Sequence, residues 1–387
     1  MSETLQIIFY TDSFLPAVDG VVTSITAFKK ELEDRGHEVY IVAVGDKETK
    51  RIIKGRKDIF VVRGLKFRRY PQYKFAVTPF IVSLKLRKLN PDIVHLQTPF
   101  TVGLYGLMYS RVNKYPIVGS FHTMFNSKDI INQYLTKNPR LRKFLIKYSW
   151  EYLTYFYNKC DATITPSEAI KKYLSKKKIK NISVIPNGID TERFNKNNYD
   201  QKLKNQLVGE NSNMILYLGR ISKEKNIDIL IKAAKYLKEN NTKFIIGGTG
   251  PMLNEYKNLV NKYNLNDTVK FQGFISNEDL PKYYATADAL CLPSTFETQG
   301  IVSLEALASG TPVVGADYLA LKNIIENGKN GELFKPGNSK DCAIKLEKVI
   351  NNRSSYKKTV QTAKKYSINK MTDKLLNLYK SVLNEQI

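Results

Sequence analysis

Short apolar runs rich in Val, Ile, Leu and Phe alternate with amphipathic stretches along almost the whole chain. Apolar runs of about four to eight residues are typical of buried strands, and the stretches between them have the period of helices. Sequential βα units of this kind predict parallel sheets. The strands that we expect are residues 5–11, 38–44, 59–63, 93–97, 117–121, 162–166 and 182–186, followed by 214–218, 243–247, 269–273, 289–293 and 312–315.

The second series of strands begins after a polar stretch, residues 190–213, that is rich in Asn, Lys and Asp. A chain of 387 residues is long enough for about two domains, each with its own core. We therefore expect an α/β protein with two doubly wound, Rossmann-like domains, residues 1–192 and 193–365. The tail has a helical pattern, and a helix over about residues 366–387 is expected to pack back on the first domain.

Cysteine content and apolar segments bear on where the protein resides. Its three cysteines lie far apart, without the spacing of a disulfide framework or a zinc site. The amino terminus lacks the basic stretch and long apolar core of a signal peptide. The longest nearly apolar segment, residues 75–84, is much shorter than the ~20 residues of a membrane-spanning helix. We expect a cytoplasmic protein that does not span the membrane.

The net charge of +25 is concentrated in the first half of the chain. Residues 59–91 contain no acid, and their basic residues are interleaved with aromatic and aliphatic ones. This composition suits an anionic membrane surface, and it would also suit single-stranded nucleic acid. Alternatively, residues 80–89 are a crossover helix whose charges are only solvated. The candidate membrane contacts are Arg68, Arg69, Phe80, Arg87 and Lys88.

A second basic stretch, residues 137–159, is also rich in aromatic residues and contains one acid, Glu151. We interpret much of it as the core-facing side of a helix.

Nucleotide-binding fingerprints of the phosphate-loop and G-x-G-x-x-G types are absent from the sequence. The first strand instead leads into a long loop, residues 11–23, where Gly20 would let a phosphate approach the start of a helix. In the second half, the loop at 219–226 places Arg220 and Lys225 after a strand, where the two cations could hold a diphosphate. Taken alone, they could equally be two surface cations.

Two carboxylates, Glu297 and Glu305, flank Gly300 where the strand at 289–293 leads into a helix. The helix amino terminus would present free N–H groups to a diphosphate. A carboxylate can accept hydrogen bonds from two vicinal hydroxyls, so Glu297 could bind a sugar and Glu305 a ribose. Such a pair of acids is common when taken without other motifs.

Several motifs occur together in one order: P-S-x-x-E-x-x-G-x-x-x-L-E-A-x-A-x-G-x-P-V at 293–313, G-R-x-x-x-x-K at 219–225, G-T-G-P at 248–251 and P-N-G-I-D at 186–190. In this combination the chain resembles glycosyltransferase family 4 over almost its whole length. The resemblance implies GT-B architecture, in which two Rossmann-like domains face a central cleft, and transfer from a nucleotide sugar with retention of anomeric configuration.

The resemblance also implies residue roles. Arg220 and Lys225 would bind the donor diphosphate, Glu297 the transferred sugar and Glu305 the ribose. Backbone groups of the helix start would complete the pocket, Gly20 would approach the diphosphate from the first domain, and a histidine after a strand would lie beside the sugar. These further positions are Gly300, Ile301, Val302 and His122. No metal is expected, because no D-x-D sequence is present to hold one.

The acceptor is indicated by the first half of the chain. Residues 14–24, 94–98 and 121–123 resemble bacterial diacylglycerol glucosyltransferases, although Gln97 stands where related enzymes often have histidine. This implies UDP-glucose as donor, a membrane lipid such as 1,2-diacylglycerol as acceptor, and a peripheral position on the inner face of the cell membrane. One alternative is a family 4 enzyme that uses GDP-mannose and a soluble or polyprenyl-linked glycan. A more distant alternative is a basic nucleic-acid-binding protein.

Overall fold

The computed structural model describes residues 4–385 except 18, 68–69, 78–81, 83–85, 87–88, 123, 125–130 and 133–134. The chain divides into two compact units, each described by itself below. Unit 1 consists of Met1–Gly188 and Ile368–Ile387, and unit 2 consists of Ile189–Ser367.

Unit 1 is built on an eight-stranded sheet with the order β4-β3-β2-β1-β5-β6-β7-β8. All neighbouring pairs are parallel except β3 and β4, which are antiparallel. The strands are β1 (Gln6–Thr11), β2 (Glu38–Gly45), β3 (Ile59–Phe67), β4 (Tyr70–Ala76), β5 (Ile93–Leu96), β6 (Ile117–Ser120), β7 (Ala162–Thr165) and β8 (Ile182–Val184). The helices whose bounds lie within the described residues are α1 (Gly20–Asp34), α2 (Lys47–Ile52), α4 (Thr101–Asn113), α6 (Pro139–Asn158), α7 (Glu168–Lys176) and α16 (Ile368–Asn384).

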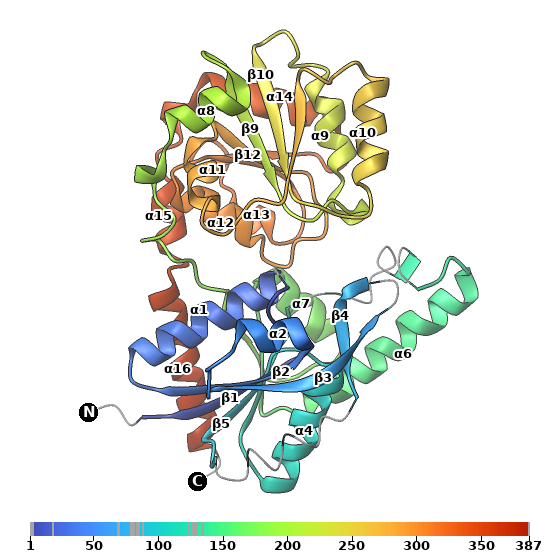
Figure 1. Ribbon diagram of the computed structural model, residues 1–387, viewed down its shortest axis with the longest axis vertical. Helices are drawn as coiled ribbons and strands as arrows, with labels where there is room; N and C mark the ends of the chain where they lie inside the picture. Colours follow the sequence, from blue (N-terminus) through green and yellow to red (C-terminus); the bar gives the residue numbers. More distant parts are fainter. Residues whose placement is uncertain are drawn as a thin grey trace. The chain divides into compact units, whose positions relative to one another are not determined.

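Alternate side chains of the central strand β1 enter two different cores. Ile7 and Phe9 pack with α1 and α16, whereas Ile8 and Tyr10 pack with α4, α6 and α7. Successive side chains of a strand point to opposite faces, so helices cover both sides of this sheet (Figure 1).

The carboxy-terminal helix α16 lies beside α1 in unit 1 (Figure 1). Its Tyr379 is buried, and the hydroxyl lies 2.6 Å from Nδ1 of His95 on β5. The other ring nitrogen of His95 lies 2.7 Å from the Ser120 hydroxyl on β6. At the surface, Arg35 pairs with Asp373 at 2.5 Å. Polar and apolar contacts thus hold the last segment of the chain against strands made much earlier.

The acid-free segment at 59–91 is partly sheet. Strand β3 is longer than expected, and the unexpected strand β4 returns antiparallel to it at the sheet edge. Lys74 on β4 is nearly buried and pairs with Asp46 at 3.0 Å, so this cation is already neutralised. Val82 and Leu86 are helical and buried. The five candidate membrane contacts Arg68, Arg69, Phe80, Arg87 and Lys88 lie outside the described residues.

Unit 2 has a six-stranded parallel sheet with the order β11-β10-β9-β12-β13-β14. Its strands are β9 (Asn213–Leu218), β10 (Thr242–Gly247), β11 (Val269–Gly273), β12 (Ala289–Leu292), β13 (Val313–Ala316) and β14 (Gly331–Phe334). Its helices are α8 (Gln201–Val208), α9 (Ile227–Ala234), α10 (Leu253–Lys262), α11 (Leu280–Thr286), α12 (Ile301–Ala308), α13 (Leu321–Ile324), α14 (Ser339–Asn351) and α15 (Thr359–Lys364). The expected class, two α/β domains with parallel sheets, is confirmed.

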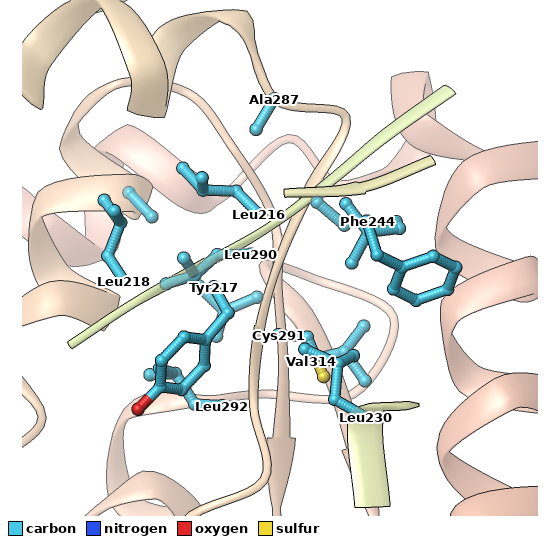
Figure 2. Packing of buried hydrophobic residues seen from close by; sticks show 14 of the residues in the cluster. Leu216, Tyr217, Leu218, Leu230, Phe244, Ala287, Leu290, Cys291, Leu292 and Val314 are labelled. Carbon is cyan, nitrogen blue, oxygen red and sulfur yellow. The ribbon is translucent and has the colours of Figure 1, made fainter. Parts of the chain in front are cut away.

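The core of unit 2 is centred on the middle strands of its sheet. Leu216, Leu290 and Val314 are fully buried, and Leu230 of α9 packs into the same cluster (Figure 2). Strands buried on both faces are apolar at nearly every position, which explains why they are recognisable in the sequence.

We expect Tyr379→Phe to lower the free energy of unfolding of unit 1 by about 1–3 kcal/mol, because His95 Nδ1 would lose its buried partner. The single tryptophan, Trp150, belongs to unit 1, so its fluorescence during urea unfolding reports on this unit. Tyr236→Phe, at an exposed position of unit 2, is the control. An unchanged midpoint for Tyr379→Phe would show that the bond contributes nothing.

Candidate active site

Two loops of unit 2 carry the predicted donor-binding residues, and the structure joins them by an ion pair. The loop after β9 contains Lys225, and the loop after β12 contains Glu297. The Lys225 Nζ lies 2.7 Å from the Glu297 Oε1, and both side chains are largely shielded from solvent. The side-chain amide of Asn226 also donates a hydrogen bond to the Thr295 hydroxyl at 3.1 Å. Because β9 and β12 are neighbours in a parallel sheet, their carboxyl ends lie at one edge.

A glycine-rich third loop packs against the loop after β9. A Cβ added at Gly248 would lie 1.9 Å from the Gly219 carbonyl oxygen, and one at Gly250 would lie 2.2 Å from that of Ile221. The amide of Ile221 donates to the Thr249 carbonyl at 2.9 Å. Glycine at these positions allows the backbones to touch, and this contact fixes the loop that carries Arg220.

Glu305 lies on α12 and is buried. The Tyr284 hydroxyl of α11 donates to its Oε2 at 2.6 Å. Burial raises the pKa of the Glu305 carboxyl, and the hydrogen bond from Tyr284 opposes this shift.

The amino terminus of α12 has no side-chain cap. Gly300 occupies the cap position with φ of 78°, a left-handed conformation that favours glycine. The N–H groups of Ile301 and Val302 are in the first turn, where a helix offers them no internal acceptor. Such a helix start, beside Lys225 and Glu297 in the same group of loops, has the features of an anion-binding site.

The helix start at Gly20 in unit 1 is different. The Asp19 carboxylate accepts hydrogen bonds from the amides of Val21 and Val22, each at 2.9 Å. It also accepts from the Ser13 hydroxyl at 2.7 Å. A carboxylate thus already occupies two of the N–H groups that a phosphate would use, and Gly20 itself is exposed beside them.

His122 follows β6 in unit 1, and its Nε2 lies 2.9 Å from the Gln97 Oε1. Because an amide oxygen only accepts, this nitrogen carries the proton. Burial lowers the pKa of His122 to about 4 and that of His95 to about 3, so both rings are neutral at pH 7. Gln97, which stands where related enzymes often have histidine, is therefore the residue that orients His122.

A small pocket in unit 1 opens beside this histidine, at the carboxyl ends of β5, β6, β7 and β8. It is lined by Ser24, Phe28, His95, Gln97, Ser120, Phe121, His122, Ile164, Pro166, Ile185, Asn187 and Leu375.

The sequence analysis did not single out Asp12, whose buried carboxylate holds two loops of unit 1 together. It accepts from the Thr98 and Thr101 hydroxyls at 2.8 and 2.7 Å, and from the amides of Val102 and Gly103 at 2.8 and 3.2 Å. Asp12 thereby caps the amino terminus of α4, although it lies 90 residues before Val102 in the chain. Its position directly after a buried strand was the available signal.

Among the described residues, no group of three or more His, Cys, Asp or Glu side chains is arranged to hold a metal ion. In the same part of the chain, no helix has both the length and the apolar character that crossing a bilayer requires.

Comparisons with known proteins agree with this fold. Residues 18–193 match the family model described as Glycosyltransferase Family 4, and residues 198–366 match the model described as Glycosyl transferases group 1. The α-monoglucosyldiacylglycerol synthase of Streptococcus pneumoniae is 35% identical over 341 residues, which are 85% of this chain and 75% of that protein. The enzyme of the same name from Acholeplasma laidlawii is 30% identical over 342 residues, 85% of each chain.

A crystal structure of Anabaena Alr3699/HepE in complex with UDP and glucose superposes on this fold with a TM-score of 0.77 at 20% identity, covering 97% of this chain and 100% of that one. The chain belongs to glycosyltransferase family 4 and is a glycosyltransferase of GT-B architecture.

The neutral histidines predict how acid affects unit 1. Between about pH 6.5 and pH 4, an unfolded chain protonates His122 but the folded chain does not, so the free energy of unfolding should fall as the pH falls through this window. We expect His122→Gln to reduce this dependence by about 1 kcal/mol per pH unit. Urea unfolding followed by Trp150 fluorescence at several pH values measures it, and parallel curves for the two proteins would contradict it.

Proposed function

We propose that this glycosyltransferase transfers glucose from UDP-glucose to a membrane lipid, 1,2-diacylglycerol, with retention of anomeric configuration. The acceptor and the sugar are suggested by the name that two relatives share, α-monoglucosyldiacylglycerol synthase. UDP-glucose and retention follow the expectation from the sequence motifs. The enzyme would act at the anionic inner face of the cell membrane, and Arg68, Arg69, Phe80, Arg87 and Lys88 remain proposed contacts there.

The observation that carries the proposal is the Lys225–Glu297 ion pair at 2.7 Å. It places a cation and a carboxylate side by side at the carboxyl edge of the sheet, near the uncapped start of α12. A sugar diphosphate has anionic oxygens next to sugar hydroxyls, which is the complementary arrangement. On donor binding, Lys225 would turn to the diphosphate and Glu297 would accept hydrogen bonds from the sugar.

When the bond between the sugar and the diphosphate breaks, negative charge accumulates on the nucleotide diphosphate and must be stabilised. Arg220, Lys225 and the N–H groups of Gly300, Ile301 and Val302 would stabilise this charge. In a retaining transfer the acceptor hydroxyl attacks from the face that the diphosphate leaves. Closure of the site around the donor would exclude water that could hydrolyse it.

Glu305 would bind the ribose of the donor. Tyr284 uses one of its oxygens, Oε2, so a ribose hydroxyl would meet Oε1. His122 would contact the transferred sugar as a neutral ring held by Gln97, and its Nδ1 would accept a hydrogen bond from a sugar hydroxyl. From the first domain, Gly20 would allow close approach to the diphosphate where a larger residue would not.

The proposed reaction is tested by transfer of radiolabel from UDP-glucose to diacylglycerol in mixed micelles that contain anionic lipid. We expect labelled lipid in the organic extract, and about 10²-fold less of it with Glu297→Gln, because the sugar would lose a transition-state contact. Glu255→Gln, an exposed glutamate on α10, is the matched control and should retain wild-type activity.

Other donors and acceptors serve as contrasting arms of the assay. Label transferred from GDP-mannose but not from UDP-glucose would refute the proposed donor. Label that remains in the aqueous phase on a soluble glycan would refute the lipid acceptor. The anomeric configuration of the product, read by NMR, decides retention.

Binding of UDP alone separates the roles of the two paired residues. We expect Lys225→Gln to weaken UDP binding about tenfold, because a cation beside the diphosphate is lost. Glu297→Gln should leave UDP binding unchanged or stronger, because Lys225 would no longer be paired with a carboxylate. Isothermal titration calorimetry measures both, with Lys257→Gln as the control at an exposed lysine. Equal weakening by both variants would contradict these separate roles.

A further inference from the structure

Helix α6 carries apolar residues on two faces. Its inner face, Trp150, Leu153, Phe156 and Tyr157, is buried in the core of unit 1. Its outer face consists of Leu141, Phe144, Tyr148 and Tyr155, which are 47, 53, 48 and 59% exposed. The sequence analysis interpreted much of this stretch as core, and the inner face agrees with that interpretation, whereas the outer face does not face the core. Sequence alone shows that aromatic residues are frequent, but not which of them a neighbouring element covers.

The outer face is a continuous stripe. Its residues are spaced by three, four and seven positions, which places them on one side of a helix over a length of about 21 Å. The Phe144 and Tyr148 rings are in contact, with centroids 4.2 Å apart. No residue from 139 to 149 is buried, although Ile146 packs against the edge of the core of unit 1, so the first three turns of α6 are covered only in part.

Cations accompany the stripe. Arg140, Lys143 and Lys147 are exposed along one side of it, and Lys159 is exposed at its end. Two of these ammonium groups lie against its rings: that of Lys147 is 5.6 Å from the Tyr148 centroid, and that of Lys159 is 5.6 Å from the Tyr155 centroid. The single acid of the helix, Glu151, is 3.9 Å from Lys147, a weak exposed pair.

We propose that the outer face of α6 docks on an anionic lipid bilayer, with Leu141 and Phe144 entering the interface and the flanking cations meeting lipid phosphates. This inference rests on the proposed function, since it supplies the surface on which a lipid acceptor is reached. Apolar and tyrosyl side chains flanked by basic ones are what an interfacial helix requires. A second copy of the same face is a poor partner, because it would bring the two sets of cations together.

Co-sedimentation with vesicles tests the surface directly. The full chain is mixed with vesicles of phosphatidylcholine, with or without 40% phosphatidylglycerol. We expect Leu141→Ser combined with Phe144→Ser to reduce binding to the anionic vesicles about tenfold, and Arg140→Gln with Lys143→Gln and Lys147→Gln to do the same. The matched controls in unit 2 are Tyr236→Ser with Phe274→Ser, and Lys238→Gln with Lys257→Gln and Lys282→Gln, all at exposed positions.

A label reports contact without removing the stripe. The three native cysteines are buried, so a polarity-sensitive fluorophore can be attached at Tyr148→Cys, and at Phe274→Cys as the control. A blue shift at position 148 but not at 274 on adding anionic vesicles supports docking. No shift at 148 while the protein pellets, or α6 variants that pellet as well as wild type, would overturn the proposal. Equal binding to pure phosphatidylcholine would overturn its electrostatic part.

Activity on a short-chain, water-dispersed diacylglycerol without vesicles separates this proposal from the proposed function. The α6 variants should keep wild-type activity there and lose it on vesicle-embedded diacylglycerol. If wild type transfers glucose to neither acceptor yet docks through α6, the proposed function fails and the docking surface stands. If wild type transfers to both and the α6 variants do so equally, the docking surface fails and the function stands.

Discussion

The ion pair between Lys225 and Glu297 determines how unit 2 presents its chemistry. The two residues are 72 positions apart, and they meet because the carboxyl ends of β9 and β12 lie side by side. Each charge is largely removed from water and is acceptable there because the other is within hydrogen-bond distance. The same pairing holds both loops in place before any ligand arrives. Under the proposed function, a sugar diphosphate would replace each partner, its anionic oxygens meeting Lys225 and its hydroxyls meeting Glu297.

Unit 1 uses carboxylates for a different purpose. Asp12 and Asp19 both follow β1, and each satisfies the amino terminus of a helix with its own oxygens. These bonds make the loops of unit 1 rigid, and they also consume N–H groups that an anion could have used. The start of α12 in unit 2 differs, because Gly300 provides no side chain that could compete for its N–H groups.

The sequence was sufficient for the fold class and the family, because buried parallel strands are apolar throughout and the motif loops keep a fixed order. The sequence did not predict strands β4 and β14, because charged residues interrupt the apolar pattern there. Strand β14 contains Glu332, which is buried and paired with Lys348 at 2.7 Å, and β4 contains Pro71 and Lys74, as an edge strand can. The Tyr284–Glu305 and His122–Gln97 bonds join distant segments, so no spacing in the sequence indicates them.

The place of α16 has a consequence for synthesis. Unit 1 is discontinuous in sequence: its last helix is translated only after all of unit 2 has been made. Until then, the sheet face that carries Ile7 and Phe9 lacks part of its cover, and His95 lacks the Tyr379 hydroxyl. Unit 2 is continuous in sequence, so it can fold before the last helix of unit 1 has been synthesised. The nascent enzyme therefore completes its two halves in the reverse of their order along the chain, and a ribosome that stops before α16 releases a protein with an exposed apolar surface.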